Sequence, residues 1–163
     1  MVEGDLELVL GWRNHPDVRR YMLTQHEISM DEHRSWFRST LLNGDKQLLI
    51  FEIDNLPYGF VQFSGLASGK VADWGFYLAP NARQGTGQSL GLAALDYGFG
   101  LLNLHKVCGQ ALEFNKPSIK FHLRLGFQQE GLLRDQHFDG RNYHSMVCFG
   151  LLAEEWSNRL KDI

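Results

Sequence analysis

The chain has 163 residues, 44% of them hydrophobic and 12% aromatic, which is enough to bury the core of one domain. Its formal charge of -3 and its scattered Lys and Arg residues give no basic patch, so a nucleic-acid partner is not expected. No apolar run approaches the roughly 20 residues that span a bilayer, and the acidic start MVEGDLELVLGWRN is unlike a signal peptide. We therefore expect one cytoplasmic domain, residues 1–163, with no membrane contact.

Helical patterns open the chain. Residues 6–14 carry apolar side chains at helical spacing after Asp5, which can cap this helix, and the pattern resumes at residues 17–22. A second helix is predicted at residues 32–43, with Asp31 as its cap. Its inward-facing side chains are expected to be Trp36, Phe37 and Leu41.

The apolar period then shortens to two, which predicts strands. Residues 47–53 and 58–66 flank the turn residues 54–57 and are typical of a hairpin. Residues 70–78 form a third predicted strand. A glycine-rich segment follows, and it leads into a helix predicted from about Gly87 to Leu102.

The remaining elements complete the order ααβββαβαββ. They are a strand at residues 106–114, a helix at 116–127, and a hairpin over 132–152 that turns at Asp139-Gly140. This order predicts a mixed α+β domain, in which residues 70–112 are the one expected parallel crossover. A last helix, AEEWSNRLKDI, can pack on its own domain or on a second subunit, which leaves a homodimer possible.

The segment NARQGTGQSLG, residues 81–91, brings several glycines to the junction of a strand and a helix. Glycines there let backbone N–H groups converge without Cβ atoms in the way, and the helix dipole adds partial positive charge. Such a loop suits a pyrophosphate. It is neither a Walker A sequence nor a complete dinucleotide-binding fingerprint, so a tight connection that binds nothing stays open.

The sequence RQGTGQSL after FYLAP, followed by LEFNKPSIKFHLRLGFQQEG, resembles the acetyl-CoA-binding core of the GNAT acyltransferase superfamily. The resemblance implies a mostly antiparallel mixed sheet flanked by helices, with the CoA pyrophosphate on the glycine loop and the pantetheine arm along the preceding strand. The residues it assigns to acetyl-CoA are Phe76, Tyr77, Leu78, Arg83, Gln84, Gly85, Thr86, Gly87, Gln88, Asn115 and Ser118. One position departs from the family pattern, because Ala82 stands where the family has Arg or Gln.

The segments WRNHPDVRRYM, HEISMDEHRSW and GLLAEEW are similar to the pseudaminic-acid-pathway members of that superfamily. Those enzymes N-acetylate the 4-amino group of a UDP-linked 4-amino-4,6-dideoxy sugar, so the similarity implies a UDP-amino-sugar acceptor. The residues expected to contact it are Arg13, Met22, His33 and Trp36. Related proteins carry a strand before the first helix, whereas only MVEG precedes Asp5 here, so we expect that strand to be missing or truncated.

Acyl transfer from a thioester to an amine needs a neutral amine and a proton for the departing thiolate. Direct attack by the amine in a ternary complex is the simplest route. Alternation along its strand sends Glu113 to the opposite face from Leu112, so it can take the amine proton or be a solvated strand-end charge. His122 stands where many superfamily members have the tyrosine that protonates the CoA sulfur, and we expect it to be the acid. A structural histidine is the alternative, with water or Tyr143 then supplying the proton.

The other histidines show no metal-ligand spacing, so no metal is expected, and the two cysteines lack a Cys-x-x-Cys pattern. Two further functions stay open. A protein N-terminal acetyltransferase of the ribosomal-protein type would share the CoA core and differ in its acceptor groove. A non-catalytic acyl-CoA-binding module would keep the loop without a usable acid.

Overall fold

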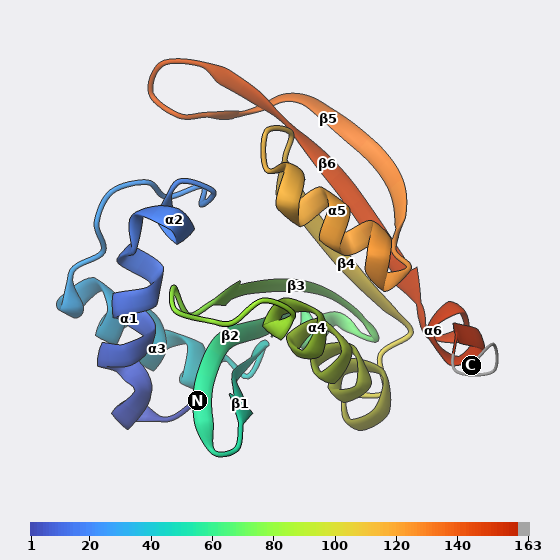
Figure 1. Cartoon of the computed structure of the whole chain (residues 1–163), viewed down its shortest axis with the longest axis horizontal. Coiled ribbons are helices and arrows are strands. Elements are labelled where there is room, and N and C mark those ends of the chain that lie inside the picture. Colours follow the sequence, from blue (N-terminus) through green and yellow to red (C-terminus); the bar gives the residue numbers. More distant parts are fainter. Residues whose placement is uncertain (160–163) are drawn as a thin grey trace.

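A computed structural model describes residues 1–159, and Figure 1 shows its six strands as one curved sheet with helices against both faces. The strand order is β1-β2-β3-β4-β6-β5. The strands are β1 (Lys46–Ile53), β2 (Leu56–Ser64), β3 (Val71–Leu78), β4 (Lys106–Leu112), β5 (Gln128–Phe138) and β6 (Tyr143–Leu152). The α-helices are α1 (Leu6–Asn14), α2 (Pro16–Arg19), α3 (Met30–Asn43), α4 (Thr86–Asp96), α5 (Lys116–Leu125) and α6 (Ala153–Arg159). The predicted order of helices and strands is confirmed.

The first helices differ from the prediction in how they are capped. Asp5 stands before α1, but its carboxylate accepts the Val2 N–H at 2.7 Å and makes no capping hydrogen bond. The cap of α3 is Ser29, not Asp31: its hydroxyl accepts the Glu32 N–H, and Glu32 reaches back to the Ser29 N–H. This capping box starts the helix two residues earlier than predicted. The described chain opens with the short helical turn η1 (Glu3–Asp5), and β1 lies at an edge of the sheet.

The buried face of α3 also differs from the prediction. His33, Phe37 and Thr40 are buried at a spacing of four and three residues, whereas Leu41 is 63% exposed. Because an α-helix turns once every 3.6 residues, a stripe through 33, 37 and 40 carries Leu41 past the edge of the buried face. The expectation for Leu41 was therefore wrong.

The first hairpin turns more tightly than predicted. Asp54 and Asn55 both have positive φ, at 53° and 61°, so the turn needs only these two residues and β2 starts at Leu56. Consecutive positive-φ residues give the turn a twist that matches the two strands. The predicted helix from 87 to 102 is observed as α4 followed by a π-helical turn, η3 (Tyr97–Leu101).

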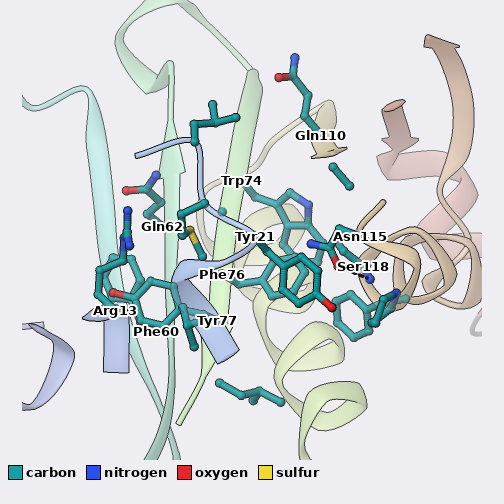
Figure 2. Close-up of a pocket in the computed structure, with 18 of the residues that line it drawn as sticks. Arg13, Tyr21, Phe60, Gln62, Trp74, Phe76, Tyr77, Gln110, Asn115 and Ser118 are labelled. Carbon is teal, nitrogen blue, oxygen red and sulfur yellow. Dashed lines mark hydrogen bonds between the residues drawn. The ribbon is translucent and has the colours of Figure 1, made fainter. Parts of the chain in front are cut away.

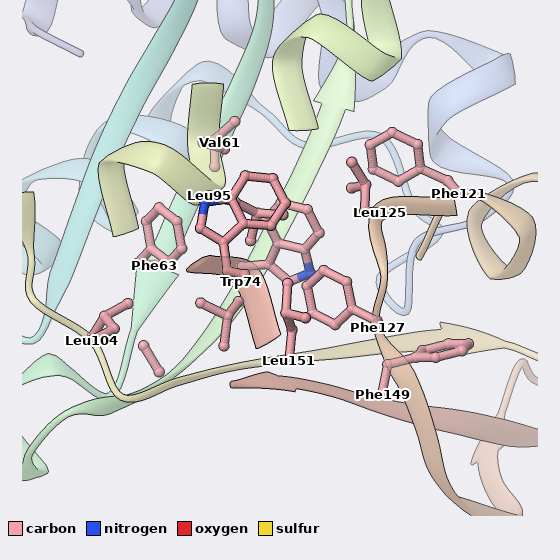
Figure 3. Close-up of a cluster of buried hydrophobic side chains, with 14 of the residues drawn as sticks. Val61, Phe63, Trp74, Leu95, Leu104, Phe121, Leu125, Phe127, Phe149 and Leu151 are labelled. Atoms are coloured by element: carbon pink, nitrogen blue, oxygen red, sulfur yellow. The ribbon is translucent and has the colours of Figure 1, made fainter. Parts of the chain in front are cut away.

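Two apolar clusters hold the helices on opposite faces of the sheet. The larger cluster joins α4 and α5 to the sheet, and Figure 3 shows Trp74 among Leu95, Phe121 and Phe127. The smaller cluster packs α1 and α3 against β1 and β2 through side chains that include Val9, Phe37 and Phe60. Since successive side chains of a strand point to opposite faces, the middle strands contribute to both clusters.

The sheet opens in its middle. β3 and β4 form its parallel pair, but their register covers only Val71–Asp73 against Lys106–Cys108. Beyond Asp73 and Cys108 the two strands separate, while β4 stays paired with β6 along its whole length. The divergence leaves a gap between the two halves of the sheet, and a cleft forms there.

The C-terminal hairpin of β5 and β6 starts earlier than predicted, because pairing with β6 reaches back to Gln128. α6 packs on its own domain: Trp156 is 6% exposed, and its indole N–H donates to Asp96 at 3.0 Å. The prediction for the last helix extends to residues 160–163, which lie outside the described residues.

Candidate active site at the divergence of β3 and β4

A cleft of about 1100 Å³ occupies the gap between β3 and β4. Figure 2 shows the side chains that line it, with Trp74 and Phe76 on the side of α5 and Arg13, Phe60 and Tyr77 on the side of the N-terminal helices. The cleft thus has two halves. We name them the α5 half, which begins at the glycine loop, and the N-terminal half, which α1, α3 and the segment between α2 and α3 enclose.

The glycine loop is built as the sequence predicted for an anion site. Gly85 is the N-cap of α4 and has a φ of 91°, a conformation that side-chain-bearing residues rarely adopt. Within the described chain, the N–H groups of Gly85 and Gly87 donate to no acceptor. These amides stand at the positive end of the helix dipole, where a phosphate is favoured.

The side chains of the loop contribute less than its backbone. Gly87 lines the cleft, whereas Arg83, Gln84 and Gln88 are exposed and do not line it. Thr86 is buried at 6% exposure and also stays out of the cleft lining. The backbone of this loop is therefore the part that fits a pyrophosphate.

The predicted pantetheine strand borders the gap. Phe76, Tyr77 and Leu78 all line the cleft. Phe76 and Leu78 pack toward the α4 and α5 cluster, while Tyr77 packs with Phe60 in the opposite cluster. One edge of β3 is paired with β2, and past Asp73 its other edge is free of β4, as a strand edge that binds an extended ligand must be.

Asn115 and Ser118 close the α5 half of the cleft. The Asn115 carboxamide oxygen accepts the Ser118 N–H at 3.2 Å and so caps α5. The carboxamide N–H group remains for a ligand, since it donates to no acceptor in the described residues. Both residues line the cleft.

His122 lies at the inner wall of the cleft but is 1% exposed. Its Nδ1–H donates to the Ser118 carbonyl at 2.8 Å, and its Nε2 accepts the Trp74 indole N–H at 3.1 Å. Its ring stacks on Phe149 with centroids 4.6 Å apart. Burial lowers the pKa of His122, so the geometry and the environment both favour a neutral ring with its two nitrogens occupied.

Glu113 does not line the cleft. It follows the last residue of β4, and its carboxylate accepts the Ser145 N–H at 3.2 Å. This bond extends the contact between β4 and β6 past the end of the ladder. The carboxylate is therefore occupied at the sheet edge and not directed into the site.

The four residues expected to contact the acceptor, Arg13, Met22, His33 and Trp36, all line the N-terminal half. Arg13 Nη2 donates to the Thr24 carbonyl at 2.8 Å, but its Nη1 is buried without a partner among the described residues. His33 is 5% exposed, and its Nε2 is likewise unpartnered. Buried polar atoms are almost always hydrogen-bonded, so two orphans in one cleft indicate groups that a ligand completes.

Aromatic rings form the floor below these polar atoms. The rings of His33 and Trp36 stack with centroids 5.1 Å apart, and Phe60 lies between Trp36 and Tyr77. Burial raises the pKa of Tyr77, which keeps its phenol neutral, and burial lowers the pKa of Arg13 without removing its charge at neutral pH. This half therefore offers a half-buried guanidinium above a flat apolar surface, with the exposed carboxylates of Asp17 and Glu32 also in its lining.

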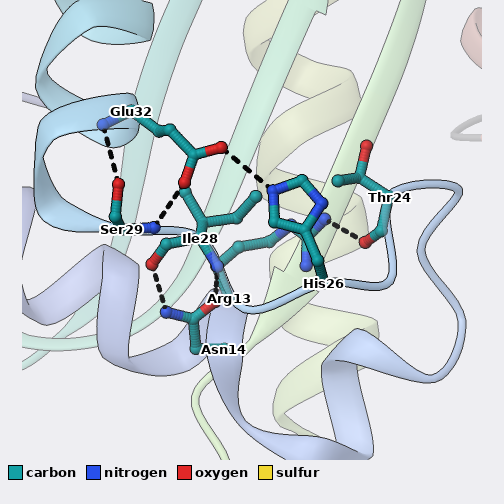
Figure 4. A network of polar contacts seen from close by, with 7 residues as sticks. All are labelled: Arg13, Asn14, Thr24, His26, Ile28, Ser29 and Glu32. Carbon is teal, nitrogen blue, oxygen red and sulfur yellow. Dashed lines mark hydrogen bonds and ion pairs between the residues drawn. The ribbon is translucent and has the colours of Figure 1, made fainter.

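A polar network holds the segment that encloses this half (Figure 4). Asn14 exchanges two hydrogen bonds of 2.8 Å with the backbone of Ile28. Glu32 accepts from Ser29 and contacts His26 at 3.0 Å, and these bonds lower its pKa to about 2. These bonds fix the segment between α2 and α3 to both α1 and α3. Thr24, whose carbonyl accepts from Arg13, lies on this segment.

Sequence reasoning gave no role to several polar or aromatic residues that line the cleft, among them Tyr21, Gln62, Asp73 and Gln110. The signal available for three of them was a polar residue inside an apolar strand, since Gln62, Asp73 and Gln110 lie on β2, β3 and β4. Asp73 is the last residue of β3 that pairs with β4, and the cleft begins at this point. The sequence of the strands does not show which face of the sheet the N-terminal helices cover.

A family model described as an acetyltransferase (GNAT) domain matches residues 1–128 of the chain. The chain belongs to the GNAT acetyltransferase family. It is therefore an acyltransferase that uses acetyl-CoA. The backbone amides at Gly85 and Gly87 fit its pyrophosphate, and the free edge of β3 fits its extended arm.

Similar proteins include sequence relatives and solved structures. The chain is 31% identical over 131 residues to the SPbeta prophage-derived uncharacterized N-acetyltransferase YokL of Bacillus subtilis, covering 78% of this chain and 73% of that one. It is 26% identical over 123 residues to the acetyltransferase PseH of Campylobacter jejuni, with 76% of each chain covered. The crystal structure of spermidine N-acetyltransferase from Vibrio cholerae with CoA and spermine superposes with a TM-score of 0.88 at 22% identity, over 97% of this chain and 95% of that one. This last similarity shows the fold.

Two searches of the described residues bear on other classes of site. No helix within residues 1–159 is both long and apolar enough to cross a bilayer. The same residues hold no cluster of three or more His, Cys, Asp or Glu side chains arranged for a metal ion.

Proposed function

We propose that the protein N-acetylates the 4-amino group of a UDP-linked 4-amino-4,6-dideoxy sugar, with the amine attacking acetyl-CoA directly. The observation that carries this proposal is the buried, unpartnered Nη1 of Arg13 in the N-terminal half of the cleft. A guanidinium N–H that lacks an acceptor is complementary to an anionic group, and a diphosphate provides one. The similarity to PseH supports the same acceptor class.

The surroundings of Arg13 support an acceptor with a flat apolar part as well as an anionic one. Trp36 and Phe60 line the cleft with their rings, and His33 Nε2 offers a lone pair beside them. A nucleotide sugar has a planar base, hydroxyl donors and a diphosphate. Each of these can meet one of the three kinds of group that the cleft presents.

Asp73 is the carboxylate best placed to take the amine proton. It lines the cleft at the point where β3 and β4 separate, whereas Glu113 is held by the Ser145 N–H outside the lining. A general base must lie within hydrogen-bond reach of its proton or one water away, which only a group in the cleft satisfies. The function we propose therefore uses Asp73, directly or through water.

A polyamine acceptor is the second candidate. Asp17 and Asp73 line the cleft and can attract a cationic chain, and the Vibrio cholerae relative at 23% identity is a spermidine N(1)-acetyltransferase. Arg13 argues against it, because its half-buried guanidinium repels a second cation, whereas the carboxylates of Asp17 and Asp73 are exposed and their attraction is weakened by water. The sign of the charge in the N-terminal half is thus the property to test.

The test measures thiol release from acetyl-CoA with three acceptors at equal concentration: a UDP-4-amino-4,6-dideoxy sugar, spermidine, and a peptide with a free N-terminal amine. We expect kcat/KM for the sugar nucleotide to exceed the others by at least about 100-fold, the range that a lost charged contact plus an unpaired buried group produces. UDP alone should compete with the amine and not with acetyl-CoA. A preference for spermidine, with no inhibition by UDP, would show that the acceptor is a polyamine.

A further inference from the structure

The leaving thiolate of CoA needs a proton, and the one ring proton of neutral His122 is already used in a hydrogen bond. In its neutral form the ring carries one N–H, and Nδ1–H is used by the Ser118 carbonyl at 2.8 Å. The lone pair on Nε2 is used by the Trp74 indole at 3.1 Å. A second proton on this ring would break the bond from Trp74, whose N–H can only donate.

Space around His122 is also filled. A Cβ atom built on Gly109 would lie 2.4 Å from Nε2 of His122 and 2.8 Å from Nε1 of Trp74, so the ring is pressed against bare β4 backbone. The opposite side of the ring faces Phe149 at a centroid distance of 4.6 Å. This packing leaves the imidazole no room to rotate toward the cleft.

Tyr21 brings a phenol side chain into the cleft near the start of α5. It follows α2, lines the cleft, and packs its ring against Phe114 with centroids 6.3 Å apart. Phe114 directly precedes Asn115, the cap of α5. Figure 2 shows the Tyr21 side chain on the side of the cleft that holds Phe76, Asn115 and Ser118. Ser118 lies one helical turn before His122 on α5.

The other tyrosines near the site are less well placed. Tyr77 lines the cleft from the opposite face of β3, where it packs with Phe60. Tyr143 is 64% exposed at the end of the C-terminal hairpin, stacks on Phe138, and does not line the cleft. Of these phenols, Tyr21 is the one that both lines the cleft and packs against the segment leading into α5.

We propose that Tyr21, not His122, protonates the departing sulfur of CoA, and that His122 is a positioning residue that fixes Trp74 against α5. As the bond between the amine nitrogen and the acetyl carbon forms, the bond between that carbon and sulfur breaks. The sulfur takes the electron pair and accepts the Tyr21 hydroxyl proton, and the phenolate regains a proton from solvent. This inference rests on acetyl-CoA as the acyl donor and not on the identity of the acceptor.

The experiment compares Tyr21→Phe with the matched control Tyr143→Phe. Both changes remove one phenol oxygen and keep the ring, so Tyr21→Phe retains the contact with Phe114. For Tyr21→Phe we expect kcat to fall by up to about 100-fold, the low end of general-acid contributions, with unchanged acetyl-CoA affinity by calorimetry. Tyr143→Phe should match the wild type.

A second readout needs no acceptor. The ultraviolet absorbance of the thiolate gives the pKa of the CoA thiol in the binary complex. A phenol that donates to the sulfur stabilises the thiolate, so Tyr21→Phe should raise that pKa by about one unit, a tenfold effect. Because this measurement uses CoA alone, it tests Tyr21 as the proton donor even if the proposed acceptor is incorrect.

Three results would overturn the proposal. The first is a folded Tyr21→Phe protein with wild-type kcat and an unchanged thiol pKa. The second is a loss of kcat without any change in the thiol pKa, which would make Tyr21 a contact for the acceptor. The third is an equal effect in Tyr143→Phe.

Discussion

The two halves of the cleft are built in different ways. In the α5 half, the groups that we propose for acetyl-CoA are backbone amides at Gly85 and Gly87 and the free edge of β3. In the N-terminal half, they are side-chain atoms, and Arg13 Nη1 and His33 Nε2 are left without a partner. Backbone groups depend on the fold and not on side-chain identity, so the first half can be shared across a family whose acceptors differ. We therefore propose that the second half determines which acceptor this chain uses.

The largest effect that tests this contrast is expected at Gly87. Its added Cβ would meet Leu78 at 3.4 Å, an ordinary contact, so Gly87→Val should fold while placing a side chain where the pyrophosphate approaches. We expect acetyl-CoA affinity to fall by at least about 100-fold, or about 2.7 kcal/mol, by calorimetry. Gly85 is a less suitable site, because its φ of 91° makes any substitution there strained.

Gly11→Val is the matched control for Gly87→Val. Gly11 lies in α1, away from the cleft lining, with no atom within 4 Å of an added Cβ. It should leave acetyl-CoA binding unchanged. Wild-type affinity in a folded Gly87→Val protein would remove the loop from the cofactor site.

The contrast between the halves also explains what could be predicted from the sequence. The glycine loop was recognisable because Gly85 needs a positive φ and because strand, loop and helix are consecutive in the chain. Arg13 and His33 were found by resemblance alone. Tyr21 and Asp73 were missed, because their place in the cleft depends on how distant segments fold over the sheet.

Helix caps were also difficult to predict from the sequence. Asp31 and Ser29 are both good capping residues, and the choice between them depends on the reciprocal bond from Glu32. Similarly, the end of the first hairpin depended on two consecutive positive-φ residues, Asp54 and Asn55, which the alternation of the strands did not reveal. Element type followed from periodicity, whereas boundaries depended on single hydrogen bonds.

A smaller effect than that of Gly87 is expected at Arg13, on the acceptor side of the comparison. Arg13→Ala should raise KM for the sugar nucleotide by about 10- to 100-fold, the value of a hydrogen bond to a charged group, with little change in KM for acetyl-CoA. Initial rates over both substrates measure this split. Arg13→Lys keeps the charge and is the control for folding, since it loses the bond to Thr24 without leaving a cavity. Equal changes in both KM values would make Arg13 a structural residue.

Acid should destabilise the protein through its buried histidines. Burial lowers the pKa of both His33 and His122 below the ordinary value of 6.5, so the unfolded chain binds more protons than the folded one. Their stabilisation is therefore complete above about pH 6.5 and is lost as the pH falls below it, by up to about 1.4 kcal/mol per pH unit for each residue.

Urea denaturation at about pH 7.5 and about pH 5.5 checks this expectation. His122→Phe should flatten the pH dependence of the free energy of unfolding, whatever its stability at neutral pH. An unchanged slope would show that His122 takes up its second proton without cost in the folded state.

The smallest expected effect concerns the helix that positions His33 in the N-terminal half. Ser29 accepts the Glu32 N–H at 3.2 Å, and Ser29→Ala leaves that amide of the first turn of α3 without its cap. Loss of such a cap costs about 1 kcal/mol of unfolding free energy. If the N-terminal half depends on how α3 starts, KM for the acceptor should rise slightly while acetyl-CoA affinity stays constant. Ser39→Ala, on the same helix but away from the cleft lining, is the control. A change in acetyl-CoA affinity in Ser29→Ala would contradict the independence of the two halves.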